Sequence, residues 1–143
     1  MISPAGLRLI RLFESFSAMP YICAGGYQTL GFGHVVRPGE AFDLPLSLES
    51  GEKLLLANVS KTERAISRLI RVPLSQNQWD ALTSWTFNLG GGALQASTLR
   101  QVINRGDLDE APDQIRRWVY AGGRKLRGLV KRREIEARLF ACG

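Results

Sequence analysis

The sequence predicts an α+β fold in which a small N-terminal β lobe is joined by one long helix to a helical C-terminal lobe. Three observations indicate this fold. Residues 21–36 are rich in Tyr, Thr, Phe and Val around Gly25-Gly26, which is typical of a hairpin or small sheet. A periodic apolar pattern then occupies residues 47–72, and helix caps and glycine stops recur from there to the end of the chain. A cleft between the two lobes is the natural place for a substrate.

The first helix is predicted over residues 4–17. Ser3 followed by Pro4 supplies a side-chain cap and a proline at the first helical position. Apolar residues of this segment share one face at 100° per residue, and Glu14 lies at the margin of that face. Pro20 is expected to end the helix. The carboxyl group of Glu14 should therefore be half-buried near a helix C-terminus.

The remainder of the chain is predicted to be helical. A connecting helix of roughly 22 residues begins at Ser47 and ends before Pro73. Ser75 and Gln78 form a capping box for a further helix, which stops at the glycines 90–92. A short helix capped by Ser97 ends at Gly106, a further segment runs from Asp109 to Gly122-Gly123, and a basic amphipathic helix ends the chain at about 128–141. Residues 1–143 thus form a single domain: an N-terminal helix and β lobe (about 1–46), a connecting helix (47–72) and a helical lobe (73–143).

Composition restricts the classes of partner. The 143 residues include 19 Lys and Arg against 13 Asp and Glu, a formal net charge of +6. Residues 1–110 carry ten charges of each sign, so the whole excess lies in residues 111–143. This last quarter predicts a basic surface suited to an anionic polymer or membrane, with a merely solvated helix face as the alternative. Nothing in the sequence resembles the basic strands or recognition helix of a nucleic-acid-binding protein.

The cysteines and the N-terminus indicate neither a metal site nor an export signal. Cys23 and Cys142 lie far apart and lack the close spacings of zinc and redox sites, so we expect free thiols, no metal and no cofactor. The first residues have no basic and apolar leader, and no apolar run approaches the ~18 residues of a membrane span. We therefore expect a chain that is synthesised in the cytoplasm, and we separately expect it to be a monomer.

Several segments then follow one another in an order that resembles one enzyme family. Glu14 is followed at fixed offsets by Cys23 and Thr29 and then by the string Gly-Phe-Gly-His at 31–34. Residues 7–14, 78–90, 97–104 and 118–136 add further matching segments. Together they resemble the phage-type lysozymes of glycoside hydrolase family 24, in which aspartate is commoner than cysteine at the second position. The resemblance implies a lysozyme-like fold and an endolysin that hydrolyses the β-1,4 bond between N-acetylmuramic acid and N-acetylglucosamine in peptidoglycan, which lyses the host.

The resemblance implies that Glu14 is the general acid and that Cys23 and Thr29 hold and activate the attacking water. Glycoside hydrolysis needs a protonated carboxylic acid, and the negative helix end and the apolar neighbours of Glu14 both disfavour its charged form. A thiol is a weaker base than a carboxylate, so three hypotheses stay open for Cys23: positioning water, attacking the sugar as a thiolate with retention, or packing as a structural thiol. Thr29 carries a hydroxyl that can orient a water, or serves simply as a β-branched strand residue.

A second group of side chains is expected around these three. Amide and guanidinium groups recognise sugar hydroxyls, N-acetyl groups and carboxylates, and glycines permit close approach of the backbone. The candidates for substrate contact are Gly31, Phe32, Asn88, Arg117 and Trp118. Packing alone is the alternative for Trp118. The resemblance implies a packing and hydrogen-bonding role beneath the sheet for His34, the single histidine of the chain, with a catalytic role as the alternative.

Two other functions remain open at this stage. A lytic transglycosylase would cleave the same bond with the single acid and no water. A non-catalytic cationic protein would act through residues 111–143, for which we also expect contact with an anionic membrane or lipopolysaccharide. Because no export signal is visible, the resemblance suggests a cytoplasmic endolysin that reaches periplasmic peptidoglycan after release by a holin, or else from a processed precursor.

Overall fold

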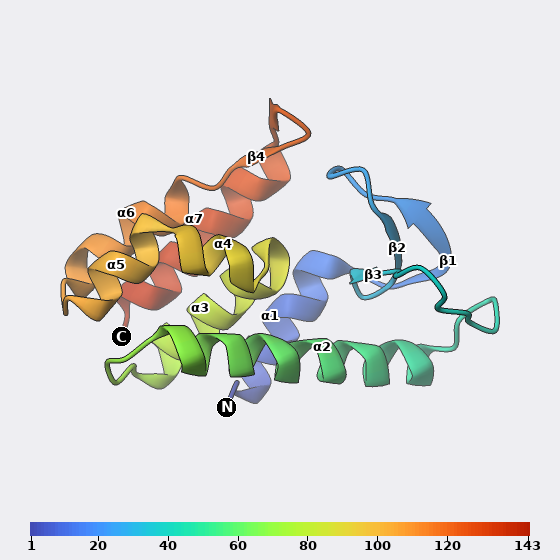
Figure 1. Ribbon diagram of the computed structural model, residues 1–143, viewed down its shortest axis with the longest axis horizontal. Coiled ribbons are helices and arrows are strands. Elements are labelled where there is room, and N and C mark those ends of the chain that lie inside the picture. Colours follow the sequence, from blue (N-terminus) through green and yellow to red (C-terminus); the bar gives the residue numbers. More distant parts are fainter.

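The computed structural model describes residues 1–143 and arranges them as two lobes joined by one long helix (Figure 1). The β lobe lies at one end of this helix, and the helices of the second lobe gather at the other. In chain order the elements are α1 (Pro4–Glu14), β1 (Ser17–Ile22), β2 (Gln28–Gly31), β3 (His34–Val35), α2 (Leu48–Leu69), α3 (Gln76–Leu89), α4 (Gly91–Ala96), α5 (Thr98–Asn104), a 3-10 turn (Leu108–Glu110), α6 (Ala111–Arg116), β4 (Tyr120–Ala121), β5 (Arg124–Lys125) and α7 (Arg127–Ala141).

The N-terminal helix is shorter than its sequence pattern predicts. α1 ends at Glu14 because Ser15 adopts a positive φ of 53°, which turns the chain out of the helix. The next residues form β1, so the predicted continuation of the helix to residue 17 is wrong. Pro20 lies inside β1, where it is tolerated because β1 is an edge strand. Glu14 thereby becomes the last residue of α1, directly at the junction with the sheet.

The sheet is antiparallel in the order β1-β2-β3. Tyr21 pairs with Thr29 across β1 and β2, and Leu30 pairs with His34 across β2 and β3. The pairing of β1 with β2 shifts register between residues 17 and 21. Because alternate residues of a strand face opposite sides, Thr29 and Leu30 are both buried but on different faces of β2.

The connecting helix and the capping box are confirmed. α2 has 22 residues, and the Ser47 side chain accepts a hydrogen bond from the backbone N–H of Ser50 at its start. α3 begins with the reciprocal capping box of Ser75 and Gln78. These local signals need no tertiary partner, which is why the sequence pattern locates them well.

Two elements of the helical lobe differ from the predicted pattern. The glycines at 90–92 do not simply end a helix, because Gly91 already starts α4. The segment that begins near Asp109, for which the sequence indicated only its ends, consists of the 3-10 turn, α6 and the hairpin β4–β5. Gly122 and Gly123 adopt positive φ values of 58° and 75°, and this left-handed backbone forms the hairpin turn.

Two separate apolar clusters stabilise the fold. The larger cluster surrounds Trp85 of α3 and joins α2, α3, α5, α6 and α7. The smaller one joins α1 to α2 through Ile10, Leu55 and Val59 and includes Phe32 from the turn before β3. Burial of these side chains stabilises the lobes, and the smaller cluster fixes α1 against α2. The end of α1, with Glu14, cannot move without disturbing one of the clusters.

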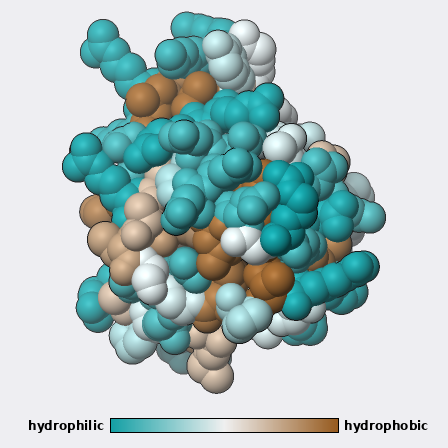
Figure 2. Space-filling view, turned by 90° about the vertical axis from the view of Figure 1, so that its left-hand side faces the viewer, coloured by the Kyte–Doolittle hydropathy of each residue, from teal (hydrophilic) through white to brown (hydrophobic).

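The basic excess of residues 111–143 is only partly a surface. Arg132 and Arg133 are buried, and Arg116 and Arg138 form ion pairs with Glu134. The end of the helical lobe is covered mostly by hydrophilic residues with separate small apolar areas (Figure 2). None of the helices combines the length and the apolar character that a membrane span requires.

Candidate active site

A cleft of about 510 Å³ lies between the β lobe and the helical lobe. Its lining comes from both lobes, with Glu14 at the end of α1 between them. The lining residues used below are Glu14, Tyr21, Cys23, Tyr27, Thr29, Gly33, Asn88 and Tyr120. Glu14, Cys23 and Thr29, which the sequence analysis put forward as catalytic, therefore face one common space.

The carboxyl group of Glu14 is held by an arginine from the far end of the chain. Arg132 of α7 donates from Nη1 to Glu14 Oε2 at 2.7 Å, and the two side chains are 5% and 14% exposed. Arg132 also donates to the backbone oxygen of Ser84, and its guanidinium group lies 4.8 Å from the centre of the Phe13 ring. Arg11, the nearer candidate on α1, pairs with Glu52 instead. The sequence analysis missed Arg132, because its contact with Glu14 spans 118 residues.

Arg132 is itself part of a buried network of charges. Glu136 has no exposed surface and accepts from both Arg132 and Arg133. Arg133 in turn donates to the amide oxygen of Asn88, which lines the cleft. Burial lowers the pKa of Arg133 below its usual value, although the neighbouring Glu136 carboxylate opposes this shift. The network thus connects the cleft to the packed centre of the helical lobe.

Gly33 lies directly against the carboxyl group of Glu14. Its φ is +72°, and a Cβ atom at this position would lie 2.5 Å from Glu14 Oε1. Any side chain here would therefore strain the backbone and displace the carboxyl group. With Arg132 on Oε2 and Gly33 beside Oε1, Glu14 has little freedom to change its orientation.

Cys23 lies in the tight turn that joins β1 to β2. Its N–H donates to the Tyr27 carbonyl and its own carbonyl accepts from the Gly26 N–H, both at 2.9 Å. Burial raises the pKa of the Cys23 thiol, but hydrogen bonds from Thr29 and from the backbone at Tyr27 and Gly25 outweigh this, so the pKa lies below its ordinary value. The site therefore favours the thiolate more than an isolated cysteine does.

Thr29 lies beside Cys23 on β2 and is only 3% exposed. Its hydroxyl donates to the Tyr27 carbonyl at 3.0 Å. Tyr21, its partner across the sheet, has a raised pKa because of burial and, after that, the negative charges of Glu14 and Cys23. The phenol is therefore held protonated as a donor near both groups. Sequence reasoning did not single out Tyr21.

The structure brings only one of the five predicted substrate contacts, Asn88, into the cleft. Phe32 is buried against Phe16, with ring centres 5.3 Å apart. Gly31 is buried at the end of β2, where an added Cβ would meet Leu46. Both residues support the sheet from behind, where they do not line the cleft.

Arg117 and Trp118 also lie outside the cleft. Trp118, in the segment between α6 and β4, packs edge-on against Trp85 of the core, with ring centres 5.4 Å apart. Arg117 is exposed and donates to the side chain of Gln114. The exposed aromatic side chains that do line the cleft are Tyr21 and Tyr27 of the β lobe and Tyr120 of the helical lobe.

His34 is buried beneath the sheet, at 7% exposure. Its Nε2 lies 3.1 Å from Glu40 Oε1, and its Nδ1 lies 3.0 Å from the side-chain nitrogen of Asn58 on α2. The ring also packs edge-on against Phe42. These contacts tie the turn after β2, and with it Gly33, to the connecting helix.

The two lobes also approach one another at the mouth of the cleft. An added Cβ on Gly122, in the β4–β5 turn, would lie 3.1 Å from the carbonyl oxygen of Ala24 in the β1–β2 turn. No group of three or more His, Cys, Asp or Glu side chains is placed to hold a metal ion. Cys23 and Cys142 are unpaired.

Comparison with known proteins agrees with this geometry. The family described as phage lysozyme matches residues 11–136, which include every catalytic candidate. The chain belongs to the phage lysozyme family. Its relatives include an endolysin of Bacillus phage B103, 39% identical over 99% of this chain, and an endolysin of Acyrthosiphon pisum secondary endosymbiont phage 1, 36% identical over 97% of it. The phage lysozyme chain spans 54% of the first relative's length and 97% of the second's.

Solved structures of the same type superpose closely. The endolysin of Escherichia coli O157:H7 phage FAHEc1 has a TM-score of 0.84 and 32% identity over 98% of this chain and 92% of its own. The muramidase domain of SpmX from Asticcacaulis excentricus has a TM-score of 0.85 and 30% identity over 98% and 97%. The α+β lysozyme-like fold is thereby confirmed for this phage lysozyme.

Proposed function

We propose that this phage lysozyme is a muramidase that hydrolyses the β-1,4 bond between N-acetylmuramic acid and N-acetylglucosamine in bacterial peptidoglycan. The observation that carries the proposal is the position of Glu14. Its carboxyl group closes the end of a cleft that also holds Cys23 and Thr29, and a buried guanidinium group fixes its orientation. The names of the relatives, endolysin and muramidase domain, fit the same activity.

In this mechanism Glu14 is the general acid. Arg132 holds Oε2, and a carboxylic acid can keep that bond through its carbonyl oxygen while Oε1 carries the proton. Oε1 would then donate the proton to the glycosidic oxygen, and the C1–O bond would break with positive charge developing on the sugar. After the proton transfer, Glu14 is a carboxylate, and the guanidinium group of Arg132 would stabilise its negative charge.

Cys23 and Thr29 would act on the opposite side of the scissile bond. The lowered pKa of Cys23 makes its sulfur an acceptor for a proton of the attacking water, and the Thr29 hydroxyl orients that water. Attack by water gives inversion at the anomeric carbon, whereas direct attack by the Cys23 thiolate would give retention. The product anomer, measured by NMR immediately after cleavage, separates the two.

Polar and aromatic groups of the cleft would bind the glycan. Asn88 supplies an amide that Arg133 holds in place. Tyr27 and Tyr120 are 62% and 64% exposed on opposite lobes, where their faces can stack on sugar rings. Gly31, Phe32 and His34 are proposed to support the sheet behind the site.

We also propose action on periplasmic peptidoglycan after release from the membrane, because several relatives are SAR-endolysins.

The test is mass spectrometry of the muropeptides that purified peptidoglycan releases with the wild-type chain and with Glu14→Gln. Products with a reducing muramic acid end, absent with the variant, are expected. Products with a 1,6-anhydro end would identify a lytic transglycosylase instead. A lytic effect that Glu14→Gln retains in full would contradict the proposal and indicate a binding protein that acts through its cationic surface.

A further inference from the structure

The two groups assigned to the attacking water both act as acceptors. The hydroxyl of Thr29 has a single hydrogen, which is shared inside the protein between the Tyr27 carbonyl, 3.0 Å away, and the sulfur of Cys23. Thr29 can therefore only accept a hydrogen bond from a water, and a Cys23 thiolate does the same. A water that donates to both still has two lone pairs. One must face the anomeric carbon, and the other needs a donor.

Tyr21 carries a donor on the same face of the sheet. It pairs with Thr29 across β1 and β2, and residues paired in this way direct their side chains to the same side. It also precedes Cys23 by two positions, and all three residues line the cleft together with Glu14. Tyr21 is 41% exposed, so a molecule in the cleft can reach it.

The hydroxyl of Tyr21 is free to bind such a molecule. Burial and, after it, the negative charges of Glu14 and Cys23 raise the pKa of Tyr21, and no hydrogen bond within the protein contributes to the shift. The phenol therefore lies near both groups, stays protonated when they ionise, and donates to neither. Polar groups that face one another without a direct hydrogen bond are commonly bridged by water.

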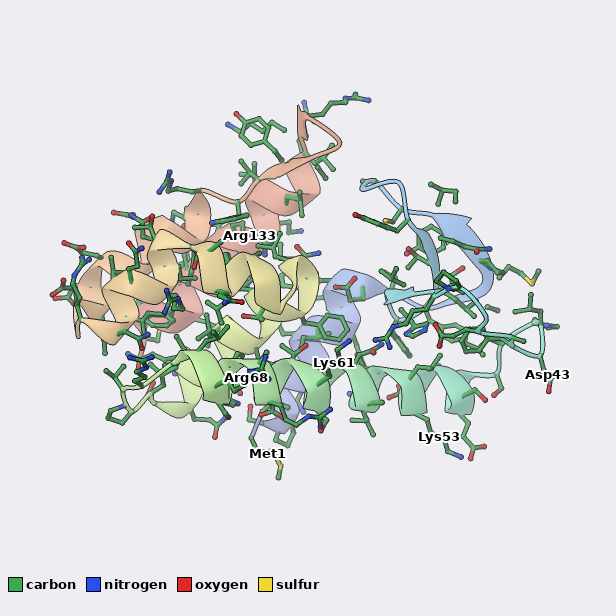
Figure 3. All side chains as sticks on the ribbon, viewed as in Figure 1. Met1, Asp43, Lys53, Lys61, Arg68 and Arg133 are labelled. Atoms are coloured by element: carbon green, nitrogen blue, oxygen red, sulfur yellow. The ribbon has the colours of Figure 1, made fainter.

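Other donors of the cleft are less suited to this water. In the β1–β2 turn, the N–H groups of Cys23 and Gly26 are bonded to carbonyl groups of the turn itself. The side-chain amide of Asn88 is held by Arg133 in the helical lobe, across the cleft from the sheet (Figure 3). Tyr27, the other tyrosine of the β lobe, is 62% exposed and lies outside the paired strands.

We propose that Tyr21 is a further catalytic residue of this phage lysozyme, which donates a hydrogen bond to the attacking water and directs its free lone pair toward the anomeric carbon. Glu14 gives its proton to the leaving oxygen, the water oxygen bonds to the anomeric carbon, and one proton of the water passes to Cys23. Tyr21 keeps its own hydrogen throughout. The inference rests on the proposed function, because only hydrolysis uses a water.

The first test is Tyr21→Phe, which removes the hydroxyl and keeps the ring. We expect kcat to fall on the order of tenfold to a hundredfold, because the water is less firmly oriented, and KM to stay within about twofold. Steady-state release of reducing ends gives both constants. Isothermal titration of a peptidoglycan tetrasaccharide into Glu14→Gln, with and without Tyr21→Phe, should give equal affinities, because the hydroxyl holds the water and not the sugar.

A double-mutant cycle with Thr29→Val tests whether both hydroxyls hold the same water. The loss that Tyr21→Phe causes should be several-fold smaller in Thr29→Val than in the wild type, because contacts to one water are not independent. Tyr27→Phe is the matched comparison. It also removes a phenol hydroxyl from the cleft, and it should change kcat by the same factor in both backgrounds.

Three results would overturn the proposal: wild-type kcat in Tyr21→Phe, an affinity for the tetrasaccharide that falls as much as kcat, or losses that multiply fully in the cycle. The second would assign the hydroxyl to the sugar. Failure of the proposed function is visible separately, because the wild-type chain would then release products with a 1,6-anhydro end or no products.

Discussion

Replacing Arg132 with Met should damage both stability and catalysis, because one side chain serves the cleft and the core. Methionine keeps much of the volume and removes the charge. Glu14 would lose its only ion-pair partner, and Glu136, which has no exposed surface, would keep Arg133 as its one ion-pair partner beside the hydroxyl of Ser84. Removing one member of a buried ion pair typically costs about 3–5 kcal/mol. For a domain of this size, that corresponds to a fall in Tm of roughly 6–20 °C.

The catalytic loss should appear in kcat. Without Arg132 the carboxyl group of Glu14 is free to rotate, and misplacement of a reacting group by about 1 Å can cost on the order of 10²-fold. The assays are thermal unfolding by circular dichroism and release of reducing ends from soluble peptidoglycan fragments, well below the Tm of the variant. KM should change much less than kcat, because Arg132 does not line the main cleft.

Arg138→Met on the same helix is the matched control. Arg138 is 77% exposed and pairs with Glu134 at the surface, so its loss should cost less than about 1 kcal/mol and leave kcat unchanged. Arg132→Lys should fall between the two, because the charge stays but the guanidinium fork is lost. An Arg132→Met variant with wild-type kcat and a Tm within about 2 °C of wild type would refute the reasoning.

Three further outcomes concern the immediate surroundings of Glu14 and Cys23. Gly33→Ala should lower kcat on the order of tenfold or more, because its Cβ would lie 2.5 Å from Glu14 Oε1; steady-state kinetics of reducing-end release would measure it. Thr29→Val should raise the pKa of Cys23 by removing the hydroxyl, so that the pH profile of iodoacetamide alkylation shifts to higher pH. Cys23→Asp should keep activity and yield the inverted anomer, because the same donors can hold a carboxylate; product NMR would test this.

Each of these has an outcome that contradicts it. Full kcat in Gly33→Ala would mean that the carboxyl group moves without penalty. An alkylation profile of Thr29→Val that stays in place or moves to lower pH would exclude the hydroxyl as the cause of the lowered pKa. Loss of all activity in folded Cys23→Asp, with Cys23→Ser also inactive, would favour the thiolate nucleophile over a role in positioning water.

Local signals in the sequence predict most of the helices and miss the irregular elements. Ser47, Ser75 with Gln78, and Pro73 define helix ends through contacts with near neighbours, and α2 and α3 follow as expected. The end of α1 and the β4–β5 hairpin were not predicted. In both places the chain changes direction at residues with positive φ, namely Ser15 and the glycines 122–123. The spacing of apolar residues along the sequence carries no information about the sign of φ.

In the candidate site, too, the sequence predicts some residues correctly as lining the cleft and misplaces others. Glu14, Cys23 and Thr29 were put forward because their spacing in one short segment resembles the phage lysozyme signature, and only for Glu14 did the chemistry of glycoside hydrolysis give an independent reason. Arg117 and Trp118 were expected in the cleft from their chemistry alone, but Trp118 packs against the core at Trp85. A residue's type suggests what it can bind, whereas only the packed fold decides which space it faces.

The contact between Glu14 and Arg132 shows why the full site could not be derived from either segment. A carboxyl group at the end of a helix meets the negative pole of the helix, so burial there is costly unless a cation compensates it. That cation arrives on α7, whose own placement depends on packing against α3 and on the buried pairs around Glu136. The negative charge of Glu14 at the end of α1 is therefore compensated only when α7 packs in place. Detachment of α7 should remove the ion pair that holds Glu14 and, with it, the catalytic geometry of this phage lysozyme.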